Sequence, residues 1–404
     1  MEPLNPRVTG AAPQATGRER LILALNSGSS SLKFGVYRVT SDHVQRCLAG
    51  EAQALGTQAG RLDVTGPHGQ SLLARALPMI GAQQALQAIE HWLEQAQWGA
   101  LDGIGHRVVH GGPRLRQPCR VDPQVLEQLQ QASVFAPLHT PPALALIQQT
   151  LEHFPGIAQV LCFDTGFHAQ MPAVAQVLAL PHALRRQGIQ RYGFHGLSCQ
   201  SIVRHLQPHL PERLVIAHLG NGASVTAVRA GQSVDTSMGL TPSGGLVMST
   251  RSGDLDPGVL VYLMRQTGLD AAAVEDLVDR QAGLLGISGL SGDMRTLQQA
   301  APDHAGARLA IEMFCYSAYK QIAAMIAVLG GIDTLVFTGG IGENDAALRA
   351  RICAGLAWTG LALDSELNTA GNDRISGPAS AFAVRVLACR EDQEIARHAW
   401  QLVA

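Results

Sequence analysis

Residues 21–39 read LILALNSGSSSLKFGVYRV, a pattern typical of two strands joined by a tight turn. The first five residues form an apolar run, and residues 32–39 alternate well enough to predict a second strand. The same order returns in residues 214–229, LVIAHLGNGASVTAVR, close to half the chain's length farther on. A strand–turn–strand pattern that recurs at this spacing predicts a duplicated domain.

The rest of the chain alternates between helical and strand patterns. Apolar periodicity predicts helices over residues 81–97 and 306–329, the second ending at Gly330. The other expected elements are buried strands at 335–338 and 384–388, a glycine-rich turn at 339–344, a helix from about Ala346 and a closing helix at 391–402. Strands interleaved with helices predict the α/β class.

Length and composition favour a folded chain with two domains. The chain has 404 residues, whereas one hydrophobic core usually serves roughly 250–300. Apolar residues make up 46% and charged residues only 15%, which supports large buried cores. The 30 basic residues are offset by 32 acidic ones, a net charge of -2, and basic residues form no run. We therefore expect neither nucleic acid nor a membrane as a partner.

Targeting signals and membrane spans are not expected either. The longest apolar stretch, residues 322–332, is shorter than the ~20 residues that span a bilayer. Residues 1–20 lack the apolar core of a secretory signal and are predicted to be a flexible extension. The seven cysteines are scattered, with no C-x-x-C pair. They fit a reducing compartment, so we expect a cytoplasmic protein.

Three glycine-rich turns each follow an apolar strand, at residues 27–31, 220–223 and 339–342. The P-loop and dinucleotide fingerprints are both absent from the sequence. Glycine nevertheless lets backbone N–H groups approach a phosphate. One such turn is commonly an ordinary hairpin, but three of them favour a phosphate-binding cleft. Lys33, one of only two lysines in the chain, adjoins the first turn.

Charged residues stand beside glycine and apolar residues at several places. His106 and His110 have the i,i+4 spacing of metal ligands on a helix, but Val-Val between them and Gly-Gly after them indicate a strand end instead. Arg107 and Arg251 are either ordinary salt-bridge partners or planar donor forks for a carboxylate or phosphate.

Nine ordered motifs together resemble the acetate kinase family, and the match as a whole runs from Leu21 to the C-terminus. They are Asn26–Lys33, Gly105–Gly112, Ala136–His139, Phe163–His168, Tyr192–Gly196, His218–Gly222, Asp235–Gly239, Thr250–Asp254 and Gly339–Asn344. The resemblance implies two ribonuclease H-like α/β domains of the actin, sugar kinase and chaperone ATPase superfamily. It places one domain at residues 21–168 plus 393–404 and the nucleotide-binding domain at 169–392. It further implies a homodimer that phosphorylates acetate reversibly with ATP.

The resemblance also implies site residues, position by position. Arg107, Asp164, His195 and Arg251 would be catalytic, with Arg107 on the substrate carboxylate. Val109, Leu138, Phe194 and Pro242 would face the methyl end of the substrate. The nucleotide would contact Lys33, His218, Leu219, Gly220, Asn221, Gly222, Asp293, Met294, Arg295, Gly340, Ile341, Gly342, Glu343 and Asn344. Asn26 and Glu391 would hold Mg²⁺, with Mn²⁺ as the alternative ion.

The chain departs from the family pattern at three places near these residues. Leu197 and Cys199 replace the threonine and histidine of Gly-Thr-Ser-His. Ser243 and Gly244 replace the leucine and glutamate of Thr-Pro-Leu-Glu-Gly, and Cys389-Arg390 replaces Thr-Asn before Glu391. We expect these changes to affect the pocket and the metal affinity rather than the class of reaction.

Phosphoryl transfer requires in-line positioning and neutralisation of the charge on the transferred group. Arg107, Arg251, His195 and Mg²⁺ are expected to supply positive charge. Asp164 need not be a general base, since a carboxylate substrate is already ionised, and it is expected to orient an arginine or a metal-bound water. Two alternatives stay open: a kinase for propionate or another short-chain acid, and a non-catalytic actin-like nucleotide-binding module.

Overall fold

The computed structural model describes residues 18–28, 31–53, 57, 59–77, 82–95 and 99–403. The chain divides into two compact units. Unit 1 comprises Met1–His106, Leu146–Leu161 and Ile395–Ala404, and unit 2 comprises Arg107–Ala145 and Cys162–Glu394. The domain limits expected from the family resemblance, 21–168 plus 393–404 and 169–392, stay a prediction. The extension expected at 1–20 lies mostly outside the described residues, and the first strand begins at Arg20.

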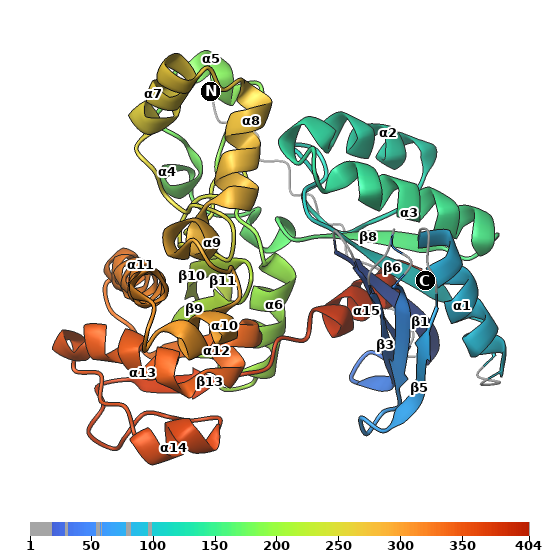
Figure 1. Cartoon of the computed structure of the whole chain (residues 1–404). Helices are drawn as coiled ribbons and strands as arrows, with labels where there is room; N and C mark the ends of the chain where they lie inside the picture. The colour runs from blue at the N-terminus through green and yellow to red at the C-terminus, as the bar shows by residue number, and fades with distance from the viewer. Residues whose placement is uncertain are drawn as a thin grey trace, which may run out of the picture. The chain divides into compact units, whose positions relative to one another are not determined.

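Unit 1 contains most of a mixed sheet with the strand order β5-β4-β3-β2-β1-β6-β8-β7 (Figure 1). The strands are β1 Arg20–Ser27, β2 Ser31–Val39, β3 Val44–Gln53, β4 Arg61–Thr65, β5 Ser71–Ala76, β6 Gly103–Val108, β7 Cys119–Arg120 and β8 Gln159–Phe163. β1 pairs antiparallel with β2 and parallel with β6. The predicted first hairpin is therefore confirmed.

The core of unit 1 is formed by apolar side chains of the sheet and of helix α1, Ala82–Gln95. Ala85, Leu86 and Ile89 of α1 are buried, as expected for one face of a helix. The predicted helix at 81–97 is confirmed over its described part. β6 carries Gly105 because a Cβ there would lie 2.5 Å from Ile395 of α15, Glu391–Leu402.

Unit 2 contains a sheet with the order β11-β10-β9-β12-β13 (Figure 1). Its strands are β9 Arg213–Leu219, β10 Ala223–Arg229, β11 Gln232–Thr236, β12 Thr334–Thr338 and β13 Ala383–Val386. β9 pairs antiparallel with β10 and parallel with β12. Both sheets thus place a hairpin's first strand beside a later, parallel strand, and the predicted second hairpin is confirmed.

Helices surround the sheet of unit 2 and complete its core. The longest, α11, Ala305–Leu329, buries Phe314, Ala318 and Ile322 and ends at Gly330 with φ 69°, as predicted. The remaining helices are α2 Pro123–Ala132, α3 Thr140–His153, which runs from unit 2 into unit 1, α4 Ala173–Gln176, α5 His182–Arg185, α6 Gly196–His205, α7 Pro257–Thr267, α8 Ala271–Asp276, α9 Gly283–Ser288, α10 Met294–Ala300, α12 Gly339–Asn344, α13 Ala346–Gly355 and α14 Ser365–Ala370. Short 3₁₀ or π turns lie at Ser133–Phe135, Gly166–His168, Leu277–Gln281 and Ala357–Thr359.

Three local predictions need correction. Residues 339–344 form helix α12 rather than an open turn, because Glu343 accepts a hydrogen bond from the Gly339 N–H and closes the first turn. The last strand ends at Val386 instead of Ala388, since its parallel partner β12 pairs only as far as Phe337. β6 ends at Val108, so Val109 lies just beyond the strand. Among the described residues, no helix is long and apolar enough to cross a membrane.

Three buried histidines predict how the stability of the fold depends on pH. Burial lowers the pKa of His106, His110 and His168 to about 4 each. Unfolded histidine has a pKa of roughly 6.5, so below that pH the unfolded chain binds protons that the folded chain does not. The free energy of unfolding therefore falls as the pH drops from about 6.5 to about 4, by about 2 kcal/mol per histidine at pH 5. Urea unfolding at pH 7.5 and pH 5 measures this loss, and equal unfolding midpoints would contradict it.

Candidate active site

Two glycine-rich segments meet at the carboxyl ends of the parallel strands β9 and β12. His218 pairs with Thr338 at the ends of these strands, so the residues that follow lie side by side. The 220–222 turn closes with a 3.0 Å hydrogen bond from Gly220 N to Gly222 O. Gly339 has φ 80°, and a Cβ there would lie 2.7 Å from the Leu219 carbonyl oxygen. This edge of an α/β sheet is where ligands usually bind.

A third predicted nucleotide segment is connected to the same turn through Ser249. The Ser249 N–H donates to Asn221 O at 3.1 Å, and its hydroxyl donates to Gly292 O at 2.8 Å. Asp293 follows and caps α10 by accepting from Thr296 N, while the Arg295 side chain is 88% exposed. Ser249 thus connects the 220–222 turn to the segment that leads into α10. The Glu343 carboxylate accepts hydrogen bonds from the Gly339 and Cys389 N–H groups and so fixes these two backbone segments relative to each other.

Arg107 and Asp164 form a buried, bidentate ion pair. Arg107 Nε donates to Asp164 Oδ1 at 2.9 Å, and Nη2 donates to Oδ2 at 2.6 Å. Asp164 is 1% exposed. Burial raises the pKa of the Asp164 carboxyl, and the Arg107 guanidinium opposes that shift. The pairing of both carboxylate oxygens fixes the orientation of the arginine.

The side chains of Arg251 and His195 both lie beside Gly222. A Cβ on Gly222 would lie 3.2 Å from His195 Nε2 and 3.5 Å from Arg251 Nη1. Arg251 also donates to the Pro242 carbonyl oxygen at 3.4 Å, and its Nη2 lies 3.5 Å from His139 Nε2. Burial lowers the pKa of Arg251, and the nearby Arg107 lowers it further. The structure thus brings the Arg251 guanidinium and the His195 imidazole together at a glycine turn.

His195 is fixed in an unusual backbone conformation at the start of α6. Its φ is 57° and its ψ 26°, in the left-handed region that non-glycine residues rarely adopt. Nδ1 lies 2.9 Å from the Ser224 hydroxyl, and the ring stacks on His218 with centroids 4.2 Å apart. Strain and stacking together fix the direction of Nε2.

The expectation that His195 supplies a positive charge is wrong. Burial lowers the pKa of His195 well below its usual value, and the neighbouring His218, Arg107 and Arg251 lower it further. The imidazole is therefore neutral at pH 7 and acts as a hydrogen-bonding group. Burial also lowers the pKa of His218.

The four residues expected around the substrate's methyl group all belong to unit 2. Phe194 is 1% exposed and packs edge-on against His110, with ring centroids 5.5 Å apart. Val109 and Leu138 are half-buried, and the carbonyl of buried Pro242 contacts Arg251. Val109 packs against the main core of unit 2.

The two residues expected to hold Mg²⁺ lie in different units. Asn26 pairs with Lys33 across the β1–β2 hairpin of unit 1, and Glu391 begins α15 in unit 2. Ser29 and Ser30 of the first glycine turn lie outside the described residues. The Glu391 carboxylate, a hard oxygen donor, fits Mg²⁺.

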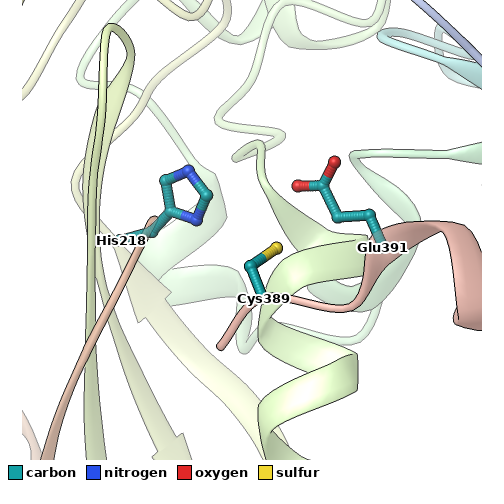
Figure 2. Close-up of side chains that lie close together, drawn as sticks. All are labelled: His218, Cys389 and Glu391. Carbon is teal, nitrogen blue, oxygen red and sulfur yellow. The ribbon is translucent and has the colours of Figure 1, made fainter. Parts of the chain in front are cut away.

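Sequence reasoning missed several side chains beside Glu391 and the histidines. Ligand atoms of His218, Cys389 and Glu391 lie within 4.8 Å of one another, as Figure 2 shows. Ser198 Oγ lies 2.8 Å from His218 Nδ1, and Ser224 contacts His195. The sequence did carry one signal for this cluster, because Cys389 departs from the family pattern just before Glu391. By contrast, His106 lies on strand β6 and not on a helix, so the i,i+4 spacing is no metal signature here.

Glycine-rich segments at the ends of parallel strands, with arginines fixed beside them, fit the phosphate-binding site that a phosphotransferase requires. Comparison with known proteins agrees, since the sequence profile of the Acetokinase family matches residues 21–397. An acetate kinase of Rhodopseudomonas palustris (strain TIE-1) is 40% identical over 395 residues, which cover 95% of this chain and 98% of that protein. An acetate kinase of Thermosynechococcus vestitus is 42% identical over 408 residues, with the same coverage.

Solved structures of acetate and propionate kinases share the fold of this chain. A propionate kinase from Francisella tularensis has a TM-score of 0.89 and 35% identity, covering 95% of this chain and all of that chain. An acetate kinase from Porphyromonas gingivalis has a TM-score of 0.84 at the same identity and coverage. This chain belongs to the Acetokinase family. It is therefore an ATP-using phosphotransferase, and the predicted fold class is confirmed.

Proposed function

We propose that the chain phosphorylates acetate with Mg²⁺-ATP, reversibly, to give acetyl phosphate and ADP. The observation that supports this best is the placement of Arg251 and His195 at the Gly222 turn, with Arg107 close enough to lower the pKa of both. Transfer of a phosphoryl group depends mainly on such positioning and charge stabilisation. The curated relatives at about 40% identity are named acetate kinases.

Acetate needs no general base, because its carboxylate is ionised at pH 7 with a pKa near ~4. In this proposal Arg107, oriented by Asp164, binds the acetate carboxylate. Arg251 and the neutral His195 contact the oxygens of the group in transfer, where charge accumulates. His218, the 220–222 turn, residues 293–295 and residues 340–344 surround the nucleotide, with Lys33 from unit 1. Bound Mg²⁺, or Mn²⁺, would neutralise phosphate charge and be held by Asn26 and Glu391.

Release of ADP in the presence of acetate, measured with and without Mg²⁺, tests this proposal. ADP formation that depends on both acetate and Mg²⁺ is expected. A non-catalytic nucleotide-binding protein would bind ATP without releasing ADP. A non-catalytic role would give no function to the buried Arg107–Asp164 pair or to the strained backbone of His195.

A preference for propionate is the second candidate, since one similar structure is named a propionate kinase. Comparing kcat/KM for acetate, propionate and butyrate separates the two possibilities. We expect acetate to be preferred and propionate to be a slower substrate, because one methylene changes specificity by only ~1–3 kcal/mol.

Val109→Ala is expected to raise kcat/KM for propionate relative to acetate by about tenfold. The half-buried valine lies two residues beyond Arg107. In this proposal its side chain faces the alkyl end of the carboxylate bound by that arginine, and its truncation makes room there. The measurement is the ratio of the two specificity constants. Val134→Ala, at a valine that is 78% exposed, is the matched control. If Val109→Ala left this ratio unchanged, Val109 would not line the acyl pocket.

Glu391→Ala is expected to raise the Mg²⁺ concentration needed for half-maximal activity by at least about tenfold. Nucleotide affinity measured without metal should stay nearly the same, because the carboxylate acts through the ion. The alternative is that Glu391 only stabilises its helix, as an acid near a helix N-terminus does through the helix dipole. Glu366→Ala, which removes an exposed acid from the first turn of α14, is the control for that role. Identical Mg²⁺ titrations of Glu391→Ala and wild type would contradict the metal role.

We also propose a cytoplasmic homodimer. Large apolar side chains on α7 and α11 are exposed, including Tyr262 at 63% and Tyr316 at 56%. Exposed apolar side chains on a helix commonly mark a surface that another protein covers. Sedimentation analysis of the full chain tests the dimer. The scattered cysteines support a reducing compartment.

A further inference from the structure

His218, Cys389 and Glu391 carry the donor types that zinc binds in proteins. Their ligand atoms all lie within 4.8 Å of one another, and Figure 2 shows the three side chains gathered around a common space. Bond lengths of about 2.0–2.3 Å place the ligand atoms of a tetrahedral zinc ion roughly 3.3–3.8 Å apart. Small side-chain movements, on the order of 1 Å, would therefore complete the site.

The backbone at Cys389 and Arg390 and the ring of His218 are held in place by the surrounding structure. The Cys389 N–H donates to Glu343 Oε1 at 3.0 Å, and the next N–H, of Arg390, donates to Ser201 Oγ at 3.2 Å. The His218 ring stacks on His195 and contacts the Ser198 hydroxyl. Only side-chain rotation is then needed to bind an ion, which lowers the entropic cost of forming the site.

The donor set discriminates between cations. Mg²⁺ prefers oxygen ligands in octahedral geometry, whereas thiolate and imidazole favour zinc and related ions. Threonine, the residue usual in the family pattern at position 389, would offer no thiolate. Cys389 therefore changes the chemistry available beside Glu391.

We infer that His218, Cys389 and Glu391 form a binding site for Zn²⁺ or a similar thiophilic divalent cation. Cys389 binds as the thiolate and releases its proton to solvent, and solvent or a nucleotide oxygen completes the coordination. Occupancy by Zn²⁺ engages Glu391 and excludes Mg²⁺ from that carboxylate, so zinc inhibits the kinase. This consequence for activity rests on the proposed function, whereas ion binding does not.

Cobalt and zinc titrations of the full chain without nucleotide test the site. Co²⁺ should give a near-ultraviolet thiolate-to-cobalt charge-transfer band in the wild type, and Cys389→Thr should abolish it. Cys389→Thr should also weaken Zn²⁺ binding by at least about tenfold. Cys47→Ser, at a half-buried thiol of unit 1, should leave both signals unchanged. A wild type without the band, or a band that persists in Cys389→Thr, would overturn the inference.

A second titration follows activity as Zn²⁺ is added at fixed Mg²⁺, with each variant normalised to its own rate without zinc. Zinc should inhibit the wild type and Cys47→Ser at concentrations at least about tenfold lower than Cys389→Thr. Equal sensitivity of all three proteins would contradict inhibition through this site. If the chain lacked kinase activity altogether, the cobalt band would still decide whether the ion binds.

Discussion

Replacing Arg251 with lysine should lower kcat for acetyl phosphate formation by about 10²–10³-fold. Arginine offers a planar fork of donors, and lysine a single ammonium that cannot contact two oxygens in the same geometry. Arg251 is half-buried beside the Gly222 turn, and its Nη1, like His195 Nε2, would lie within 3.5 Å of a Cβ on Gly222. The loss should fall on kcat rather than on the KM for ATP, because the contact forms mainly in the transition state.

Arg213→Lys is the matched control for this substitution. Arg213 pairs with Asp333 at the surface of the same unit, and both side chains are over a third exposed. Arg213→Lys should leave kcat within about twofold of the wild-type value, since exposed ion pairs contribute little to stability. An Arg251→Lys enzyme as fast as Arg213→Lys would show that Arg251 does not stabilise the transition state.

Asp164→Asn should cost both stability and activity. The asparagine leaves the Arg107 guanidinium, whose side chain is only 20% exposed, without its carboxylate. Removing one partner of a buried ion pair costs about 3–5 kcal/mol. Because Arg107 also loses its fixed orientation, kcat should fall by at least about 10²-fold. Urea unfolding and initial rates measure the two effects.

The control for Asp164→Asn is Asp333→Asn, which breaks the exposed pair with Arg213. That change should cost less than about 1 kcal/mol and leave the rate unchanged. If the two variants proved equally stable, the Arg107–Asp164 pair would not be the rigid element that the mechanism requires.

The sequence predicted the elements whose signals are local. The two hairpins at 21–39 and 214–229, the helix at 306–329 and its stop at Gly330 carry strong periodicity or glycine signals, and all are confirmed. The short helix at 339–344 was missed because its glycines have low helix propensity. Glu343 stabilises it through a side-chain contact with the Gly339 N–H within the same turn and a long-range contact with the Cys389 N–H.

The contacts of the site could be predicted only in part. The order of the motifs identified the segments at 218–222 and 339–344, and the pairing of β9 with β12 places these two segments together. The neutral state of His195 could not be read from its sequence neighbours, because it arises from burial and from His218, Arg107 and Arg251. The proximity of His218 to Cys389 joins residues far apart in the chain, and no local pattern reports it.

Phosphorus NMR of the full chain with ATP, Mg²⁺ and acetate tests the central claim most directly. We expect an acetyl phosphate signal that grows in equal amount with ADP, and its loss when acetate or Mg²⁺ is omitted. The reverse reaction, from acetyl phosphate and ADP, should regenerate ATP. ADP appearing with inorganic phosphate instead of an acyl phosphate would contradict phosphoryl transfer to a carboxylate.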